Sequence, residues 1–279
     1  MTGQTTGERP DTLLQAVADV ARLTGQAALA HFRSNLRVET KGDGSPVTVA
    51  DRAAEEVART WISARFPNDS ILGEEFGAVG DEKARRWIID PIDGTKTFVR
   101  GVPLWGTLIG VAHGEDVLAG AVYCPAVDEI VVASVGEGCW WNGSRARVSD
   151  CGDLAAATVL VTDDRFPGRP ERGSRWTAVA ADAAIARTWG DCYGYLLVAT
   201  GRAELMVDNL MSPWDAAALV PVVREAGGEF SDWDGRVTAF GNGAMATNAA
   251  LAGPLRARLG VPWPAGAETP TSARRAADV

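Results

Sequence analysis

Apolar residues recur at helical spacing near the start of the chain. They are Leu13, Val17, Ala21, Ala28 and Phe32. Their spacing predicts an amphipathic helix over residues 11–32, with Asp11 or Thr12 as its N-cap. A second helix is expected from about Thr48 to Arg65. Thr48 and Asp51 stand three residues apart, which is the spacing of a capping box, and this role alone would explain Asp51.

Short apolar segments with strand character follow these two helices and are separated by turn residues. They cover residues 70–72, 87–89, 105–111, 118–123 and 129–134. Turns between closely spaced strands are typical of neighbouring strands that pair antiparallel. The first half of the chain is therefore expected to form a mostly antiparallel meander.

Helix-like and strand-like segments alternate after about Val148. Strands are expected at 157–162, 203–207, 228–231 and 244–246, and helices at 174–181, 192–200 and 213–226. This alternation indicates a second, α/β half. The expected division is an N-terminal α+β domain at 1–147 and a C-terminal α/β domain at 148–263. Residues 264–279 are rich in Pro, Ala, Thr and charge without an apolar face, so we expect a disordered tail there.

Composition excludes several classes of function. The net charge of −9 and the pI near 4.9 argue against a nucleic-acid partner. No apolar run approaches the roughly 20 residues that span a bilayer, so no membrane partner is expected. The polar residues 1–10 are unlike a signal peptide, and a cytoplasmic protein is expected. The four cysteines lack the spacing of a zinc site, and two histidines are too few for histidine-cluster chemistry.

The segment Trp87-Ile88-Ile89-Asp90-Pro91-Ile92-Asp93-Gly94-Thr95 carries the strongest chemical signal. Two carboxylates three residues apart at the end of a buried strand can converge on a hard cation, which favours oxygen ligands. The hydroxyl of Thr95 and the backbone N–H groups of the turn could hold a phosphate. An ordinary turn with solvated aspartates would explain the same residues.

Other acids add to this signal, although each has a simpler explanation. Glu74 and Glu75 follow a short strand and could lie on a solvated face. Asp215 stands three residues after Ser212, the spacing of another capping box. Its neighbours, Trp214 and the apolar run 216–220, imply burial on most faces. A buried acid must be paired or bound to a metal.

Taken together, these segments resemble the signature motifs of the inositol monophosphatase superfamily. The motifs are Gly73-Glu74-Glu75, Trp87 to Thr95, and Trp214-Asp215 followed by Ala216-Ala217-Ala218, and the resemblance extends from about Leu13 to Leu259. It implies a layered αβαβα sandwich that combines α+β and α/β parts, in a homodimer. It also implies Mg²⁺-dependent hydrolysis of a small phosphate monoester.

The resemblance assigns roles to individual residues. Glu74, Asp90 and the backbone carbonyl of Ile92 would hold a first metal ion, and Asp90, Asp93 and Asp215 a second. Gly94 and Thr95, with Asp93 and Asp215 beside them, would face the substrate's phosphate. Thr95, hydrogen-bonded by Asp51, would help deprotonate a metal-bound water that Glu74 positions. That water would attack phosphorus in line, without a protein nucleophile.

Two other classes of protein are weighed against this interpretation. Haloacid dehalogenase-like phosphatases need a nucleophilic aspartate two residues before the second aspartate, and here that position is Pro91. A catalytically idle metal- or phosphate-binding regulator on the same scaffold is the alternative outside enzymes. The complete set of acids and Thr95 argues against the regulator.

The second half suggests which ester is bound. Residues 98–105, 187–195 and 207–210 are similar to the histidinol-phosphate phosphatase branch of the superfamily, above all Trp189-Gly190-Asp191-Cys192-Tyr193-Gly194. Histidinol phosphate carries an ammonium and an imidazole, which suit acidic partners. Gly190, Asp191, Asp208 and Arg187 are therefore expected at the substrate, with Arg187 pairing with Asp208 or bracing the site.

These specificity residues also have simpler explanations, and other substrates stay open. Asp191 could only cap the following helix, Asp208 could be a loop acid, and Arg187 could be a solvated arginine. Inositol monophosphate is one alternative substrate. A 3′-phosphoadenosine nucleotide is the other, because Lys96 directly follows Thr95.

Overall fold

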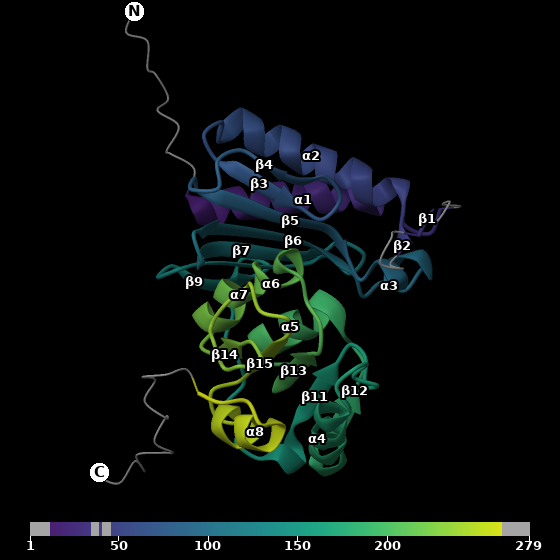
Figure 1. Ribbon diagram of the computed structural model, residues 1–279, viewed down its shortest axis with the longest axis vertical. Helices are drawn as coiled ribbons and strands as arrows, with labels where there is room; N and C mark the ends of the chain where they lie inside the picture. Colours follow the sequence, from purple (N-terminus) through teal and green to yellow (C-terminus); the bar gives the residue numbers. More distant parts are fainter. Residues whose placement is uncertain (1–11, 35–38, 41–45, 264–279) are drawn as a thin grey trace, which may run out of the picture.

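The computed structural model describes residues 12–34, 39–40 and 46–263. The predicted tail at 264–279 and the polar residues 1–10 lie outside this part of the chain. Five layers are visible in Figure 1, in the order helix, sheet, helix, sheet, helix. The predicted αβαβα sandwich is thereby confirmed.

The first layer is a pair of helices on the outer face of the large sheet. α1 (Leu13–Leu29) begins after Thr12, whose hydroxyl accepts a hydrogen bond from the Gln15 N–H, and α2 (Val49–Arg65) begins after Thr48. Both pack on the sheet through alanines and branched apolar residues, which for α1 include the predicted Val17 and Ala21. The first helix ends three residues earlier than expected.

The large sheet has eight strands in the order β10-β9-β8-β7-β6-β5-β3-β4. Their bounds are β3 Ser70–Gly73, β4 Gly77–Val79, β5 Arg86–Asp93, β6 Gly106–His113, β7 Asp116–Cys124, β8 Glu129–Ser134, β9 Gly138–Trp141 and β10 Ser144–Arg145. The run from β5 to β10 is antiparallel, as predicted for the meander, whereas β3 pairs parallel to β5. A small separate hairpin joins β1 (Glu39–Thr40) to β2 (Pro46–Val47).

The smaller sheet has five strands in the order β12-β11-β13-β15-β14. Their bounds are β11 Thr158–Val161, β12 Ile185–Arg187, β13 Leu205–Asp208, β14 Glu229–Ser231 and β15 Ala244–Thr247. Helices α4 (Pro170–Asp182) and α8 (Ala252–Leu259) cover its outer face. A single 3₁₀ turn, η1 (Leu154–Ala156), precedes β11. The strands that the second half was expected to contain are present, and β12 is added to them.

The middle layer lies between the two sheets and holds α5 (Asp191–Ala199), α6 (Pro213–Ala216) and α7 (Leu219–Glu225). The single helix expected at 213–226 is therefore two helices. Pro221 has no N–H to donate to the Ala217 carbonyl, so the regular hydrogen-bond pattern is interrupted there. One apolar cluster joins this layer to both sheets. The division into domains 1–147 and 148–263 stays a prediction.

Two glycines of the large sheet let the middle layer approach closely. A Cβ added at Gly120 of β7 would lie 2.3 Å from the Ala218 carbonyl oxygen, and one at Gly110 of β6 would lie 2.6 Å from the Ala217 Cβ. The approach places α6 against β5, where the acidic motifs meet. Among the helices in the described part of the chain, none is long and apolar enough to cross a membrane.

We expect Gly120→Ala to lower the free energy of unfolding by about 1–3 kcal/mol, because the added methyl group overpacks the contact with Ala218. Gly173→Ala in α4 is the matched control, since its added Cβ would lie 3.5 Å from the Phe166 Cβ, an ordinary van der Waals distance. Helix propensity predicts that the control leaves stability unchanged or raises it by up to about 1 kcal/mol. Urea unfolding of both variants measures the difference, and equal stabilities would contradict the packing argument.

Candidate active site

Strand β5 brings two of the predicted acids to the edge of the middle layer. Trp87, Ile88 and Ile89 are fully buried, so the strand is fixed between β3 and β6 up to Asp90. Pairing with β6 is irregular between Asp90 and Asp93, and Asp90 Oδ1 accepts a hydrogen bond from the Ile92 N–H at 3.0 Å. An irregularity of this kind changes the direction in which nearby side chains point, here those of Asp90 and Asp93.

A tight turn and a short helix follow the strand. Gly94 has φ +82°, a left-handed conformation that favours glycine, and it begins α3 (Thr95–Val99). A Cβ at Gly94 would lie 3.0 Å from Asp191 Oδ2. The Thr95 hydroxyl donates to the Ile92 carbonyl at 3.1 Å. Gly94, Thr95 and the carbonyl of Ile92 therefore lie together at the end of β5.

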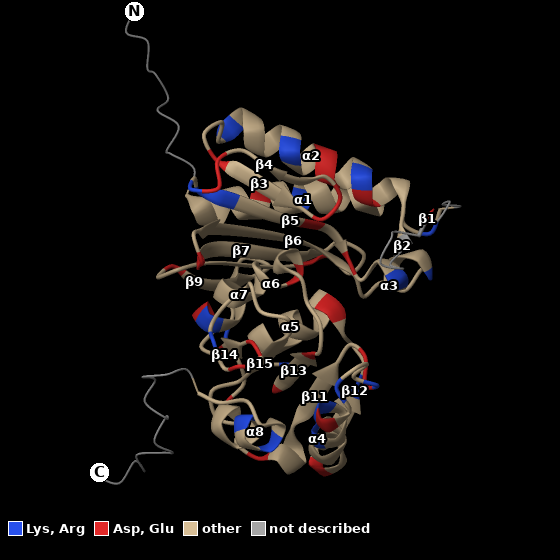
Figure 2. Ribbon diagram, viewed as in Figure 1, with Lys and Arg blue, Asp and Glu red and all other residues tan. Residues whose placement is uncertain are grey.

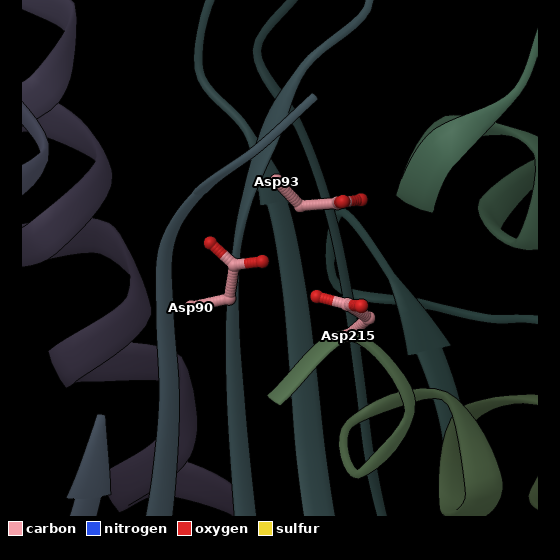
Figure 3. A group of neighbouring side chains, drawn as sticks. All are labelled: Asp90, Asp93 and Asp215. Atoms are coloured by element: carbon pink, nitrogen blue, oxygen red, sulfur yellow. The ribbon is translucent and has the colours of Figure 1, made fainter. Parts of the chain in front are cut away.

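Asp215 reaches the same place from α6. The Ser212 N–H donates to Asp215 Oδ2 at 2.7 Å, so the predicted capping role is present. One carboxylate oxygen from each of Asp90, Asp93 and Asp215 lies within 4.8 Å of the others. Figure 3 shows the three carboxylates converging from β5 and from α6 on a common space. The capping role of Asp215 and its place in the acidic cluster therefore coexist.

Glu74 and Asp51 complete the acidic group. Glu74 follows β3, and its N–H donates to the Ile89 carbonyl at 3.1 Å, beside Asp90. Asp51 is buried, and its Oδ2 accepts from both the N–H and the hydroxyl of Thr48, each at 2.7 Å. Its other oxygen, Oδ1, is buried and has no hydrogen-bond partner among the residues that the structure describes. Glu74 also lies close enough to raise the pKa of Asp51, although burial raises it more.

The predicted hydrogen bond between Asp51 and Thr95 is not formed. The Thr95 hydroxyl turns back to Ile92, three residues earlier, as threonines at the start of a turn commonly do. Asp51 uses Oδ2 for the cap of α2, and its Oδ1 has no hydrogen-bond partner within the described part of the chain. An unpartnered buried acceptor is costly, so Asp51 Oδ1 is suited to receive a ligand or a proton donor.

Burial and mutual repulsion oppose ionisation in this cluster. Burial raises the pKa of Asp90 well above its usual value, and the charge of Glu74 raises it further. Burial likewise raises the pKa of Asp93, followed by the charge of Asp191. For Asp215, burial raises the pKa to about 6. Acidic oxygens gathered in this way fit a hard divalent cation, which would neutralise them together.

A cavity of about 560 Å³ opens beside the acidic cluster. Its lining residues are Asp93, Gly94, Thr95, Lys96, Thr97, Val102, Leu104, Thr162, Asp163, Asp164, Arg165, Thr188, Gly190, Asp191 and Asp215. Figure 2 shows acidic residues on both sides of the junction between the large sheet and α5. The cavity is large enough for a small organic phosphate, and two acids of the cluster, Asp93 and Asp215, line it.

Asp191 is the one predicted specificity acid that lines this cavity. Its φ is +51°, which is uncommon for a residue with a side chain and clusters at functional sites. The Thr162 hydroxyl accepts from its N–H at 2.8 Å, and the Thr97 hydroxyl donates to its Oδ2 at 3.4 Å. The N–H of the next residue, Cys192, donates to Asp93 Oδ2. Burial raises the pKa of Asp191.

Asp208 and Arg187 lie elsewhere, and they do not pair with each other. Asp208 is buried at the end of β13, where the Tyr195 hydroxyl donates to its Oδ2 at 3.0 Å, and burial raises its pKa to about 8. Arg187 is exposed on the edge strand β12, and it lines a separate cavity with Trp176. An edge strand directs this long cation to solvent, so the predicted Arg187–Asp208 pair is corrected.

Two groups of residues were not predicted from the sequence. One group lines the wall of the cavity, and the other lies behind residues 74–77, which we call the acidic loop. Thr162, Asp163, Asp164 and Arg165 follow β11 and line the cavity. A polar run after a strand that pairs parallel with its neighbours was the available signal, because ligands bind at such strand ends. Glu55, one helical turn after Asp51 on α2, is fully buried beside Glu74. The sequence signal for Glu55 was an acidic residue within the apolar face of a helix.

Comparison with known proteins identifies the family. The inositol monophosphatase family matches residues 9–259. A histidinol-phosphatase of Chlorobaculum parvum is 43% identical over 249 residues, which cover 88% of this chain and 96% of that protein. A histidinol-phosphatase of Mycobacterium tuberculosis is 37% identical over 254 residues, which cover 89% and 98% respectively.

A solved structure has the same fold. The extragenic suppressor protein suhB of Bartonella henselae aligns with a TM-score of 0.81 at 29% identity, over 87% of this chain and 96% of that one. The family predicted from the three acidic motifs is thus confirmed. The chain belongs to the inositol monophosphatase family and is a phosphatase.

Proposed function

We propose that this phosphatase hydrolyses L-histidinol phosphate to L-histidinol and phosphate, with Mg²⁺ bound at the acidic cluster. The observation that carries the proposal is the convergence of Asp90, Asp93 and Asp215 beside a cavity that Asp93 and Asp215 line. The two histidinol-phosphatases at 43% and 37% identity support the substrate. The same function would place the enzyme in histidine biosynthesis, as a cytoplasmic homodimer.

The acidic residues fit two metal ions of the proposed kind. Glu74, Asp90 and the carbonyl of Ile92 would hold one ion, and Asp90, Asp93 and Asp215 the other. The pKa values of Asp90, Asp93 and Asp215 are raised because burial and neighbouring acids oppose their ionisation, and a cation would relieve both effects. Bound divalent cations supply a coordinated water of lowered pKa and neutralise phosphoryl oxygens.

The protein's own groups orient the phosphate and the water. Gly94 and Thr95 line the cavity beside Asp93, where they can contact phosphate oxygens. Thr95 Oγ1 holds a proton that it donates to the Ile92 carbonyl, and its lone pairs can accept a proton from the water. If Thr95 rotates away from Ile92, its hydroxyl would pass its own proton to Asp51 Oδ1 as it accepts one from the water, so that Thr95 stays neutral. Glu74 helps to orient the same water.

Further acidic groups on the wall of the cavity favour a cationic alcohol. They are Asp191, whose neighbour Cys192 bonds to Asp93, and Asp163 and Asp164 on the loop after β11. Asp163 is paired with Arg165, whose hydrogen bond lowers the pKa of Asp163, whereas Asp164 is exposed on the same loop. The ammonium and imidazole of histidinol phosphate would pair with these carboxylates. Asp208 would act from behind this wall through Thr162, with which it shares a hydrogen bond.

Two other esters are weighed because of specific residues. Lys96 and Arg165 line the same cavity, and their charges would suit the second phosphate of 3′-phosphoadenosine 5′-phosphate. Inositol 1-phosphate would need hydroxyl partners, and Thr97, Thr162 and Thr188 offer them. The alternative outside enzymes is a metal- or phosphate-binding regulator that turns over none of the three.

The direct test compares phosphate release from histidinol phosphate, inositol 1-phosphate and 3′-phosphoadenosine 5′-phosphate with Mg²⁺. We expect the highest kcat/KM for histidinol phosphate. A preference for another ester would overturn the proposed substrate.

We also expect Asp90→Asn to lose at least about 100-fold in kcat, because it removes a ligand shared by both ions. Unchanged activity of Asp90→Asn would overturn the proposed metal site.

We expect Asp191→Ala to raise KM for histidinol phosphate about tenfold or more and to change KM for 4-nitrophenyl phosphate much less. A carboxylate hydrogen-bonded to a cation contributes about 1.5–3 kcal/mol. The matched control is Asp182→Ala, which removes an exposed acid of α4 that pairs with Arg258. If Asp191→Ala affects both esters equally, Asp191 serves the shape of α5 and not the choice of substrate.

We expect the metal-free protein to lose stability as pH rises above about 4, because Asp90, Asp93 and Asp215 have raised pKa values in the folded state, about 6 in the case of Asp215. The folded chain then binds more protons than the unfolded chain, so this contribution is full below about pH 4 and is lost as pH rises. Mg²⁺ competes with those protons. Thermal unfolding with EDTA or Mg²⁺ should show a larger Mg²⁺ stabilisation at pH 7.5 than at pH 5, and equal shifts would contradict this linkage.

A further inference from the structure

Glu55 is a fully buried carboxylate that none of the acidic motifs contains. It lies on α2, four residues after Asp51, on the face that packs toward β5. A charge in this position is costly unless hydrogen bonds satisfy it. Its partners therefore show what the residue does.

The partners of Glu55 are the backbone of the acidic loop and one arginine. Glu55 Oε2 accepts from the Glu75 N–H at 2.7 Å, and Oε1 accepts from the Phe76 N–H at 3.2 Å. Arg59 Nε donates to Oε1 at 2.7 Å, and the same guanidinium donates to the Gly77 carbonyl. Helix α2 thus holds residues 75, 76 and 77 of the loop in place.

Gly73 leaves the space in which the carboxylate lies. A Cβ at Gly73 would lie 2.0 Å from Glu55 Oε1 and 2.4 Å from its carboxyl carbon. Any side chain at position 73 would therefore expel Glu55 or displace β3. The glycine before Glu74 is explained by this contact and not by its backbone angles.

Glu74 lies between two fixed points of the backbone. Its own N–H donates to the Ile89 carbonyl of β5, and the next N–H, of Glu75, donates to Glu55. We propose that Glu55 is a positioning residue, which sets the place of Glu74 at the metal site and thereby the affinity of the site for divalent cations. The inference rests on the proposed function, because it takes Glu74 as a metal ligand.

The chemistry of the carboxylate makes glutamine a sharp test. All three partners of Glu55 are donors, and a carboxylate offers acceptors on both oxygens. Glutamine has one acceptor oxygen and one NH₂ group, so in either orientation its NH₂ group faces a donor. Glu55→Gln therefore keeps the size of the side chain but releases part of the loop. Groups that orient a metal ligand typically contribute about 10- to 100-fold to metal affinity.

We expect Glu55→Gln to weaken Mg²⁺ binding about 10- to 100-fold in calorimetry without substrate. The Mg²⁺ concentration for half-maximal activity should rise by the same factor, while kcat at saturating Mg²⁺ changes less. Glu204→Gln is the matched control. Glu204 is also a buried carboxylate with a backbone partner, since Thr158 N–H donates to it, but it lies on the smaller sheet. We expect wild-type Mg²⁺ affinity from this control.

Arg59→Lys provides a second, milder variant in case Glu55→Gln fails to fold. Lysine keeps the charge but cannot contact both Glu55 and the Gly77 carbonyl through a planar fork, so a smaller weakening in the same direction is expected. Wild-type Mg²⁺ affinity in a folded Glu55→Gln or Arg59→Lys protein overturns the inference. Unchanged Mg²⁺ affinity in Glu74→Gln overturns the proposed metal site itself, so the two failures are distinguishable.

Discussion

Mutual repulsion among buried carboxylates is the constraint on which the arrangement of this chain depends. Asp90, Asp93 and Asp215 are held together although burial and neighbouring charge both oppose their ionisation. Such a cluster spreads apart unless rigid elements hold it, and here the elements belong to different parts of the sequence. A central strand supplies two of the acids, and a helix start supplies the third.

The rigidity comes from contacts that are ordinary in themselves. Gly110 and Gly120 bring the middle layer against the sheet, and the Ser212 N–H fixes one oxygen of Asp215. The capping box at Thr48 fixes Asp51 in the same manner. In both helices the cap uses one carboxylate oxygen and leaves the other for the site. Local helix stability and the assembly of the site therefore use the same side chains.

Local signals in the sequence were sufficient for much of this structure. The capping boxes at Thr48 and Ser212, the buried strand before Asp90 and the antiparallel meander were predicted because each depends on neighbouring residues. Helix α3 was not predicted, because five residues are too few to show an apolar period. Its Phe98 instead packs against Trp105, with the two ring centroids 4.7 Å apart, and this contact joins residues seven positions apart in the chain. The separate α6 and α7 follow from Pro221, a local signal that the apolar run 216–220 obscured.

Long-range placement could not be predicted from one sequence. Nothing near Asp208 shows that Tyr195 encloses it, and nothing near Arg187 shows that β12 is an edge strand. The Thr162–Arg165 wall and the contact of Glu55 with residues 75 and 76 likewise join segments that are distant in sequence. Motifs gave the identity of the acids, whereas the shape of the cavity depends on how two sheets enclose α5.

The first turn of α5 joins two tasks that are usually separable. Asp191 lines the cavity, and the N–H of the adjoining Cys192 donates to Asp93. A change of backbone at position 191 is therefore transmitted to the acidic cluster. Residues 163–165, by contrast, line the cavity from a loop, and the ion pair between Asp163 and Arg165 is internal to that loop. This loop is therefore free to vary as related enzymes diverge in substrate range. The turn at residue 191 is constrained, because a change there would disturb the hydrogen bond between Cys192 and Asp93.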